Sequence, residues 1–488
     1  MYLGIDLGTS AVKLLLMDKI GNVIKTVTED YPLNFVKETW IEQDPEDWWQ
    51  GVYQGFSKIV KGYEKDIESI SFSGQMHGLV ILDSYDKVIR PAILWCDQRT
   101  EKECEYLNNE IGKEKLVEYT GNIALTGFTL PKILWVKENE PENFAKISKV
   151  MLPKDYIAYK LSGVFATDVS DASGMLLLDV KNRQWSSEMI KISGLKEENF
   201  AEVYESYESI GNIKEEIAKE LGLNKNIKIV IGGGDQAVGA VGVGVVNDDY
   251  LSVALGTSGV VFTNNSAYSA DKYGRAHSFC HATGKYHQMG VILSAASCLK
   301  WWVEEINKNE DYNSLLKEVE SSEARELFFL PYLVGERTPH NDADVRGSFI
   351  GLSASHKRGD MTRAILEGVS FALRDCYEIL KDSDIKEKII RISGGGAKNP
   401  LWRQIISDVF NLKVETINST EGPAFGAAIL AAVGAGAFKN VNSACEQIIK
   451  CTDITIPCIQ SVEKYNVKYE KFRKLYPILK DFYKGGEI

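Results

Sequence analysis

The start of the chain alternates short apolar runs with turn residues. Apolar runs at residues 2–6, 12–17 and 23–27 are separated by Gly8 and by the polar segment around Asn22. Short apolar runs bounded by turn signals are typical of β-strands that follow one another through tight turns. The pattern therefore predicts an antiparallel meander of three strands.

Further along, apolar runs of strand length alternate with stretches whose apolar residues recur at helical spacing. Strands are predicted at 67–72, 227–231 and 389–393, and helices at 130–137, 155–161, 360–380, after Asn399 and after Pro423. The apolar run at 424–438 is shorter than the about 18 residues needed to span a bilayer and is rich in Ala and Gly, which predicts a buried helix. Alternating strands and helices predict an α/β fold.

A tetrapeptide repeat indicates how the chain is divided. Leu7-Gly8-Thr9-Ser10 recurs as Leu255-Gly256-Thr257-Ser258, about half the chain later, and both copies stand between two strand-like runs. A short repeat alone is a weak signal, but its matched context and its place near the start of each half strengthen it. We predict two related domains, residues 1–245 and 246–488.

Composition narrows the functional classes. The 488 residues include 56 Lys and Arg against 68 Asp and Glu, for a net charge of −12. This field repels polyanions, so neither nucleic acid nor an acidic membrane is an expected partner. A carboxylate, Asp6, interrupts the first apolar run, which has no basic flank, so the start is unlike a secretory signal and a cytoplasmic protein is expected. Eight cysteines form no CxxC pair and no metal-like cluster with His, so no zinc site is indicated.

The first turn carries residues suited to a phosphate. Asp6 ends a strand and is followed by Gly8, Thr9, Ser10 and Lys13. A glycine lets the backbone approach a phosphate, hydroxyls and amides donate to its oxygens, a lysine supplies countercharge, and a carboxylate can hold hydrated Mg²⁺. The alternative is a hairpin turn whose Thr and Ser satisfy its own backbone, and in isolation that alternative is favoured.

Two further glycine turns change this balance. Gly232-Gly233-Gly234-Asp235 and Gly394-Gly395-Gly396 each follow an apolar strand and precede a segment compatible with a helix. Ordering three consecutive glycines is entropically costly, which suggests that something approaches the backbone there. Asp235 could be a catalytic base or an N-cap, and its position alone favours neither.

Three polar clusters adjoin apolar runs. Gly74-Gln75-Met76-His77-Gly78 offers donors and acceptors for a polyhydroxylated ligand, although a loop histidine with a structural hydrogen bond is the simpler reading. The clusters at 95–99 and 335–339 could each be an internal salt bridge. The chain has no Gly-x-Ser-x-Gly elbow, no Walker A loop and no GxGxxG that opens a βαβ unit. Covalent hydrolases, P-loop kinases and Rossmann dehydrogenases are therefore poorly supported.

At these residues the sequence resembles the FGGY carbohydrate kinases, which share a superfamily with actin, hexokinase and the chaperone ATPases. Two long segments are similar to the family's signatures: residues 127–136, GFTLPKILWV, and residues 347–352, GSFIGL, with Asp360 and 364–367, AILE. The resemblance runs over nearly the whole chain. It implies two actin-like (ribonuclease H-like) ATPase domains, with ATP and a sugar in the cleft between them.

The resemblance also implies roles for single residues. Asp235 would be the general base, and Asp6, together with Asp235, would hold Mg²⁺. Met76, His77, Asp235 and Gln236 would contact the sugar. The ATP-binding residues would be Thr9, Ser10 and Lys13 in one domain and Gly256, Thr257, Ser258, Gly395, Gly396 and Asn399 in the other.

The sugar is expected to be D-xylulose, because the Gln-Met-His segment is similar to the sugar-binding segment of the family's D-xylulose kinases. The alternatives are an FGGY kinase for another sugar or polyol, such as ribulose or gluconate, and an actin-like or chaperone-like ATPase without sugar kinase activity. A homodimer is the expectation from the family.

Overall fold

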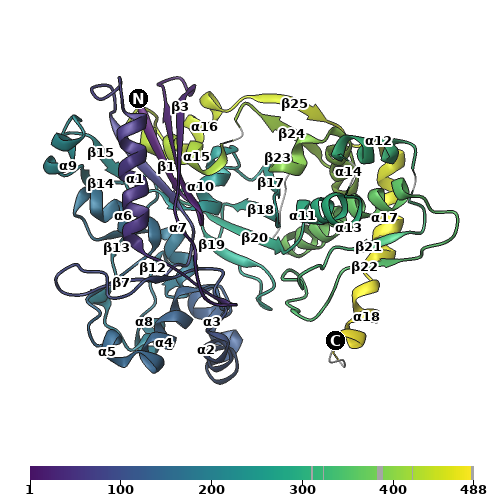
Figure 1. Ribbon diagram of the computed structural model, residues 1–488, viewed down its shortest axis with the longest axis horizontal. Helices are drawn as coiled ribbons and strands as arrows, with labels where there is room; N and C mark the ends of the chain where they lie inside the picture. The colour runs from purple at the N-terminus through teal and green to yellow at the C-terminus, as the bar shows by residue number, and fades with distance from the viewer. Residues whose placement is uncertain (309–310, 323, 382–387, 420, 485–488) are drawn as a thin grey trace.

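The computed structural model describes residues 1–308, 311–322, 324–381, 388–419 and 421–484. Figure 1 shows two lobes, each built on a mixed β-sheet with helices packed against it. The first half of the chain forms most of one lobe and the second half forms most of the other. The predicted α/β class is confirmed.

The sheet of the first lobe begins with the predicted meander. Strand β1 (Tyr2–Leu7) pairs antiparallel with β2 (Ala11–Met17), and β2 pairs antiparallel with β3 (Val23–Asp30). On its other side β1 runs parallel to β6 (Ser69–Gly74), and the order continues to β15 (Lys228–Val230) and β14 (Ser209–Asn212). Short β16 (Gly233–Gly234) also pairs with the end of β6. The strands predicted at 67–72 and 227–231 are confirmed, with small differences at their ends.

Alternate residues of β1 face two different cores. Leu3, Ile5 and Leu7 pack in the cluster that includes helices α1 (Pro45–Ile59) and α6 (Pro153–Ser162). Successive strand side chains point to opposite faces of a sheet, so Tyr2 and Asp6 lie on the other face. Asp6 is thus aimed at the side of the sheet that meets the second lobe.

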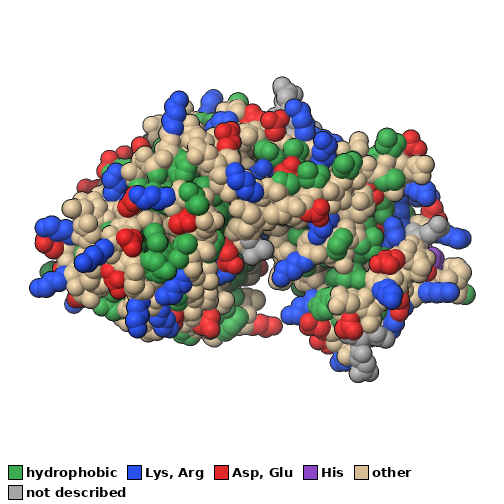
Figure 2. Space-filling model, turned by 90° about the horizontal axis from the view of Figure 1, so that it is seen from above, with side chains coloured by type: hydrophobic (Ala, Val, Ile, Leu, Met, Phe, Trp, Pro, Cys, Tyr) green, Lys and Arg blue, Asp and Glu red, His purple; other side chains and the backbone are tan. Residues whose placement is uncertain are grey.

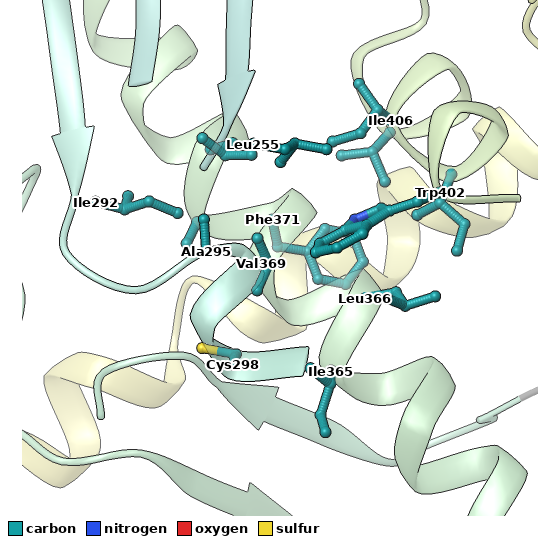
Figure 3. Packing of buried hydrophobic residues seen from close by; sticks show 14 of the residues in the cluster. Leu255, Ile292, Ala295, Cys298, Ile365, Leu366, Val369, Phe371, Trp402 and Ile406 are labelled. Atoms are coloured by element: carbon teal, nitrogen blue, oxygen red, sulfur yellow. The ribbon is translucent and has the colours of Figure 1, made fainter. Parts of the chain in front are cut away.

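The second lobe repeats this plan. Its sheet runs β19 (His277–Cys280), β20 (Tyr286–Ile292), β18 (Gly259–Asn265), β17 (Tyr250–Leu255), β23 (Ile389–Ser393), β24 (Lys413–Ile417) and β25 (Cys451–Thr455). Helices α13 (Arg358–Leu380) and α14 (Pro400–Phe410), both predicted, cover one face. Figure 3 shows Leu255, Phe371 and Trp402 in this core.

Two helices, one from each half of the sequence, pack together on the first sheet. Helix α15 (Gly422–Gly434), from the second half, packs on β1 and β6 of the first sheet and against α10 (Asp235–Gly242). The approach is close: a Cβ atom on Gly4 would lie 2.1 Å from the carbonyl oxygen of Ala424. Figure 1 shows α15 in yellow-green among the purple strands of the first lobe. The two halves of the sequence therefore share one core.

Helix α15 accounts for the longest apolar run of the sequence. Its residues 424–433 are buried against both lobes, which confirms the predicted buried helix. Across the ranges described above, no helix is both long and apolar enough to cross a membrane. Figure 2 shows the lobes joined along one side with a notch between them on the other.

Candidate active site

Three strands of the first sheet end side by side, and their last residues lead into the predicted site. Asp6 pairs with Ser73 across β1 and β6, and Gly233 pairs with Ser73 across β16 and β6. The backbone N–H of Gln75 donates to the carbonyl of Leu7 at 2.8 Å. The first turn, the Gln-Met-His segment and Asp235 consequently leave the sheet at one edge, which is where α/β proteins place their ligands.

The two carboxylates at this edge influence each other. Each residue keeps part of its surface exposed, while its carboxyl group is surrounded by protein atoms. Burial raises the pKa of Asp6 to about 6, against the opposing effects of the Ser73 hydroxyl and the Lys13 ammonium. Burial and the negative charge of Asp6 raise the pKa of Asp235 to about 7. A cation bound between or beside them would offset this repulsion.

Asp235 is not an N-cap. It is the first residue of α10, and Gly234 holds the N-cap position without a side-chain hydrogen bond. The amide of Gln236 donates to Oδ1 of Asp235 at 3.3 Å. The N-cap alternative is therefore wrong, because the helix begins one residue earlier than that reading requires, and the carboxylate is left for another purpose.

His77 is held in one orientation. Its backbone has a φ of 69°, and its carbonyl accepts hydrogen bonds from the Thr129 hydroxyl at 3.0 Å and the Lys132 ammonium at 2.8 Å. The ring Nδ1 lies 2.7 Å from the carbonyl oxygen of Gly174, so the predicted structural hydrogen bond is present. Burial lowers the pKa of His77 well below its usual range. A neutral ring whose Nδ1–H donates to a carbonyl presents Nε2 as an acceptor.

Met76 packs against Gly234, the residue before Asp235. It is 4% exposed, and a Cβ atom on Gly234 would lie 2.9 Å from its side chain. The structure thus brings Met76, His77 and Asp235 together at one strand edge. Sequence reasoning missed Thr129, Lys132 and Gly174 as supports of His77, because their contacts come from distant segments.

The first predicted phosphate turn is fastened by side chains that the sequence did not single out. The Trp95 indole donates to the hydroxyl of Thr9 at 3.0 Å, and buried Gln43 donates to the carbonyl of Thr9 at 2.7 Å. Ser10 is exposed, and its carbonyl accepts the N–H of Tyr31 at 3.1 Å. The hydroxyl of Thr9 is thus bonded to a distant tryptophan and not to its own turn.

Lys13 already has a partner in the second half of the chain. Its ammonium lies 2.8 Å from the carboxylate of Glu421, the residue before α15. Lys13 lies opposite Asp6 across β1 and β2, on the same face of the sheet. The Lys13 ammonium, the predicted countercharge, therefore lies at the sheet edge that carries Asp6, but it also pairs with the carboxylate of Glu421.

The second turn opens on a pocket of about 720 Å³ in the second lobe. Its lining contains five of the predicted ATP-binding residues: Gly256, Thr257, Gly395, Gly396 and Asn399. Ser258 is exposed beside them. The oxygen of Asn399 caps α14 by accepting the N–H of Trp402 at 2.9 Å, so its amide group is the part left for a ligand. The volume is in the range of small-molecule sites.

The close approach expected at the triple glycines is present, and the approaching atoms belong to the protein itself. A Cβ atom on Gly232 would lie 1.9 Å from the carbonyl oxygen of Phe72, and one on Gly394 would lie 2.5 Å from that of Leu255. These residues approach a neighbouring strand of the protein itself. Gly395, which lines the pocket, has no atom within 4 Å of its Cβ position.

The two other polar clusters differ from each other. Arg99 forms the predicted salt bridge, at 2.7 Å from both Asp97 and Glu42. The carboxylate of Glu336 instead accepts the backbone N–H groups of Leu293 and Arg337, at 2.8 and 2.7 Å. The described side chains of Glu336 and Arg337 form no ion pair, so the salt-bridge alternative does not hold for this cluster.

The carboxylates present fit a magnesium ion that binds through phosphate and water. The described residues contain no group of three or more His, Cys, Asp or Glu side chains placed to hold a metal. Mg²⁺ keeps several waters and uses one or two carboxylates together with phosphate oxygens. Asp6 and Asp235 supply that number of carboxylates.

The comparisons with known proteins agree with this architecture. Models of the N-terminal and C-terminal domains of the FGGY family of carbohydrate kinases match residues 1–242 and 251–435. The chain belongs to this family, and it is an ATP-dependent sugar kinase with two actin-like domains. The models leave 243–250 between them, and the boundary at 245 stays a prediction.

Individual relatives are similar over almost their whole length. A xylulose kinase of Lactococcus lactis is 42% identical over 485 residues, which cover 97% of this chain and 96% of the relative. A crystal structure of a xylulose kinase from Brucella ovis has a TM-score of 0.94, 37% identity and 99% coverage of both chains. A gluconate kinase structure from Lactobacillus acidophilus has a TM-score of 0.95 at 27% identity, covering 99% of this chain and 98% of that chain. The fold by itself therefore does not select the sugar.

Proposed function

We propose that this chain phosphorylates D-xylulose to D-xylulose 5-phosphate with ATP. The observation that carries the proposal is the convergence of Asp235, His77 and the first phosphate turn at one edge of the first sheet. The identity to xylulose kinases along nearly the full chain supports the choice of sugar.

Asp235 is the general base in this proposal. Phosphoryl transfer needs positioning and charge stabilisation more than early proton removal, and a single carboxylate suffices to accept the proton of the attacking hydroxyl. A pKa of about 7 leaves the carboxylate a large basic fraction near neutral pH while keeping it basic enough to take a proton. The Gln236 amide on Oδ1 leaves Oδ2 for the sugar hydroxyl.

His77 and Met76 orient the sugar. The neutral ring accepts a sugar hydroxyl at Nε2, because its Nδ1–H is committed to Gly174. Met76 supplies an apolar wall against the carbon chain, and Gln236 adds a further polar contact. An orientation fixed in this way turns the transfer into an effectively unimolecular step.

The phosphates of ATP lie between the two glycine turns in this proposal. Thr9, Ser10 and Lys13 hold them from the first lobe, and Gly256, Thr257 and Ser258 from the second. Gly395, Gly396 and Asn399 line the adenosine end of the pocket. When bound at Asp6 and Asp235, Mg²⁺ would neutralise phosphate charge. Closure of the lobes excludes water, the competing acceptor.

The proposal is tested by ADP release from ATP and Mg²⁺ with a panel of acceptors. The panel contains D-xylulose, D-ribulose, L-ribulose, L-xylulose, gluconate, glycerol and a sample without acceptor. Strong stimulation by D-xylulose alone is expected. If gluconate or another acceptor wins, the assignment of the sugar fails while the kinase assignment stands.

The role of His77 is tested separately. His77→Ala is expected to raise the KM for the sugar by about tenfold while the KM for ATP stays within about twofold, since one hydrogen bond and the orientation of the sugar are lost. Equal effects on both constants would remove His77 from the sugar site.

A further inference from the structure

The three glycines that lead into Asp235 have wide backbone freedom, so contacts with other segments are needed to fix their conformation. Residues 232–234 are three glycines, the residue type with the widest backbone freedom. The N–H of Gly232 donates to the backbone carbonyl of Ser206 at 3.0 Å. The N–H of Gly234, the residue before Asp235, donates to the hydroxyl of Ser170 at 3.1 Å. The second anchor is a side chain, and it is adjacent to the catalytic carboxylate.

Ser170 is itself fixed by a buried acid. It lies in the short helix α7 (Val169–Ala172), whose N-cap is Asp168. Oδ2 of Asp168 accepts the Ser170 hydroxyl at 2.5 Å and the Ser206 hydroxyl at 2.6 Å. All three residues are fully buried. Since the Ser170 proton is committed to Asp168, its oxygen is turned to accept the N–H of Gly234.

A buried lysine fixes the acid in turn. The ammonium of Lys154 lies 2.9 Å from Oδ1 of Asp168, 2.5 Å from Asp155 and 3.7 Å from Asp171. A Cβ atom on Gly74 would lie 2.8 Å from Cβ of Lys154, so the lysine stem passes directly behind the end of β6. Burying one ammonium and three carboxyl groups is a poor way to gain stability compared with apolar packing. Its benefit here is a rigid frame behind the strand ends that carry the site.

We propose that Ser170 is a positioning residue of the kinase reaction: held by Asp168 and Lys154, its hydroxyl fixes Gly234 and thereby sets the place of the Asp235 carboxylate. This rests on the role proposed above for Asp235. Ser170 does not touch the reacting atoms; it acts through the backbone of the residue before the base. A base displaced by even a fraction of an ångström loses rate, while the binding of sugar and ATP is little changed.

Ser206 provides a matched control. Its hydroxyl donates to the same oxygen of Asp168, and it is equally buried, but its hydroxyl does not bond to the glycine loop. Its contact with Gly232 uses the backbone carbonyl, which alanine retains. Ser170→Ala and Ser206→Ala therefore each remove one hydroxyl from Asp168, and only the first removes the anchor of Gly234.

The experiment compares the full-length wild type with both variants in the ADP-release assay. Ser170→Ala is expected to have a kcat about tenfold below that of Ser206→Ala, with KM values for sugar and ATP within about twofold of each other. Equal kcat values in the two variants would overturn the proposal, since a merely structural hydroxyl would act alike at both positions. If Ser170→Ala does not fold, Ser170→Cys, whose thiol is a weak acceptor of similar size, takes its place with the same criterion.

Hydrogen exchange gives a readout independent of turnover. Amide exchange in peptides containing Gly234 is expected to be faster in Ser170→Ala than in Ser206→Ala, and equal exchange would also overturn the anchor. If the wild type is not stimulated by any acceptor, the proposed function fails, and the exchange comparison still decides whether Ser170 fixes the loop.

Discussion

The two Leu-Gly-Thr-Ser turns have the same sequence and opposite surroundings. In the first, Thr9 is bonded through both its hydroxyl and its carbonyl, to Trp95 and Gln43. In the second, the side chains of Thr257 and Ser258 are exposed, and the turn opens on the pocket. The hydroxyl of Ser297 and the N–H of Ala295 donate to the carbonyl of Thr257, which fixes the backbone without using its side chain.

The strands that precede the two turns differ at one position. Asp6 pairs with Ser73 in the first lobe, and Ala254 pairs with Ser393 at the same place in the second. The repeated fold supplies two equivalent turns, but only one carries a carboxylate. At this strand position the carboxylate thus lies in the first lobe, and the pocket of about 720 Å³ lies in the second. A repeated fold can therefore carry different side chains at equivalent strand ends.

The largest effect on turnover is expected from removing the carboxylate of Asp235 in the first lobe. Asp235→Ala should lower kcat by about 10²–10⁴-fold, the usual contribution of a general base, while ATP still binds. ADP release and an ATP-binding titration measure the two quantities. Asp249→Ala, which removes an exposed carboxylate of the second lobe, is the control and should keep normal turnover. Normal turnover in Asp235→Ala would take Asp235 out of the base role.

The next largest effect tests whether the pocket of the second lobe binds ATP. Gly395→Leu should raise the KM for ATP by about tenfold or more, because the new side chain extends into the pocket from a position with no neighbour within 4 Å. The KM for the sugar is the internal control and should not change. Michaelis analysis with each substrate varied in turn measures both, and an unchanged KM for ATP would mean that this pocket is not the nucleotide site.

A smaller effect shows whether Lys13 neutralises phosphate charge or only forms an ion pair with Glu421. Lys13→Met should raise the KM for ATP about threefold to tenfold if the ammonium meets phosphate, whereas Glu421→Gln, which frees the same ammonium, should leave it unchanged or lower it. Kinetics at low and high salt measure the difference. Equal increases in the two variants would make the pair only a link between the halves.

The smallest effect concerns the pH dependence of the free energy of unfolding, and it arises from a buried histidine in the second lobe. His281 is fully buried; its Nε2 lies 3.1 Å from the carbonyl of Val245, and its Nδ1 accepts the N–H of Thr283. Burial lowers its pKa to about 3. The unfolded chain takes up a proton below the ordinary pKa of about 6.5 and the folded chain does not, so stability falls as the pH drops from about 6.5 toward 3.

His281→Gln can keep both hydrogen bonds but does not titrate. Between pH 7 and pH 5 its free energy of unfolding should fall by about 2 kcal/mol less than that of the wild type. Denaturant unfolding at the two pH values measures this difference. The same fall in both proteins would mean that the histidine is protonated without cost in the folded state.

Local pattern was enough to predict much of this molecule. The opening meander, the strand at 389–393, the helix near 360–380 and the buried helix after Pro423 were all readable, because each is bounded by turn residues and has the period of its structure. The glycine turns and Asp235 were found because they stand where strands end. The family resemblance then suggested which of them act together.

The remaining parts depend on contacts between distant segments. Nothing near Lys13 in the sequence indicates that Glu421 is its partner, and nothing near Thr9 points to Trp95. The triple glycines indicate that something approaches the backbone, and at Gly232 and Gly394 it is a neighbouring strand. A sequence pattern reports that close approach is needed, but it does not report what approaches.

The crossing of α15 has a consequence for how the chain is made. Residues 422–434 pack on β1 and β6 of the first sheet, beside α10 of the first half. During synthesis, which proceeds at about 5–20 residues per second, the part of the sheet under α15 stays uncovered until most of the second half has left the ribosome. A fragment ending at the boundary between the family's two domain models would keep it permanently exposed. The first lobe should therefore need chaperone protection while it waits, and the two halves should fold as one unit once the helix arrives.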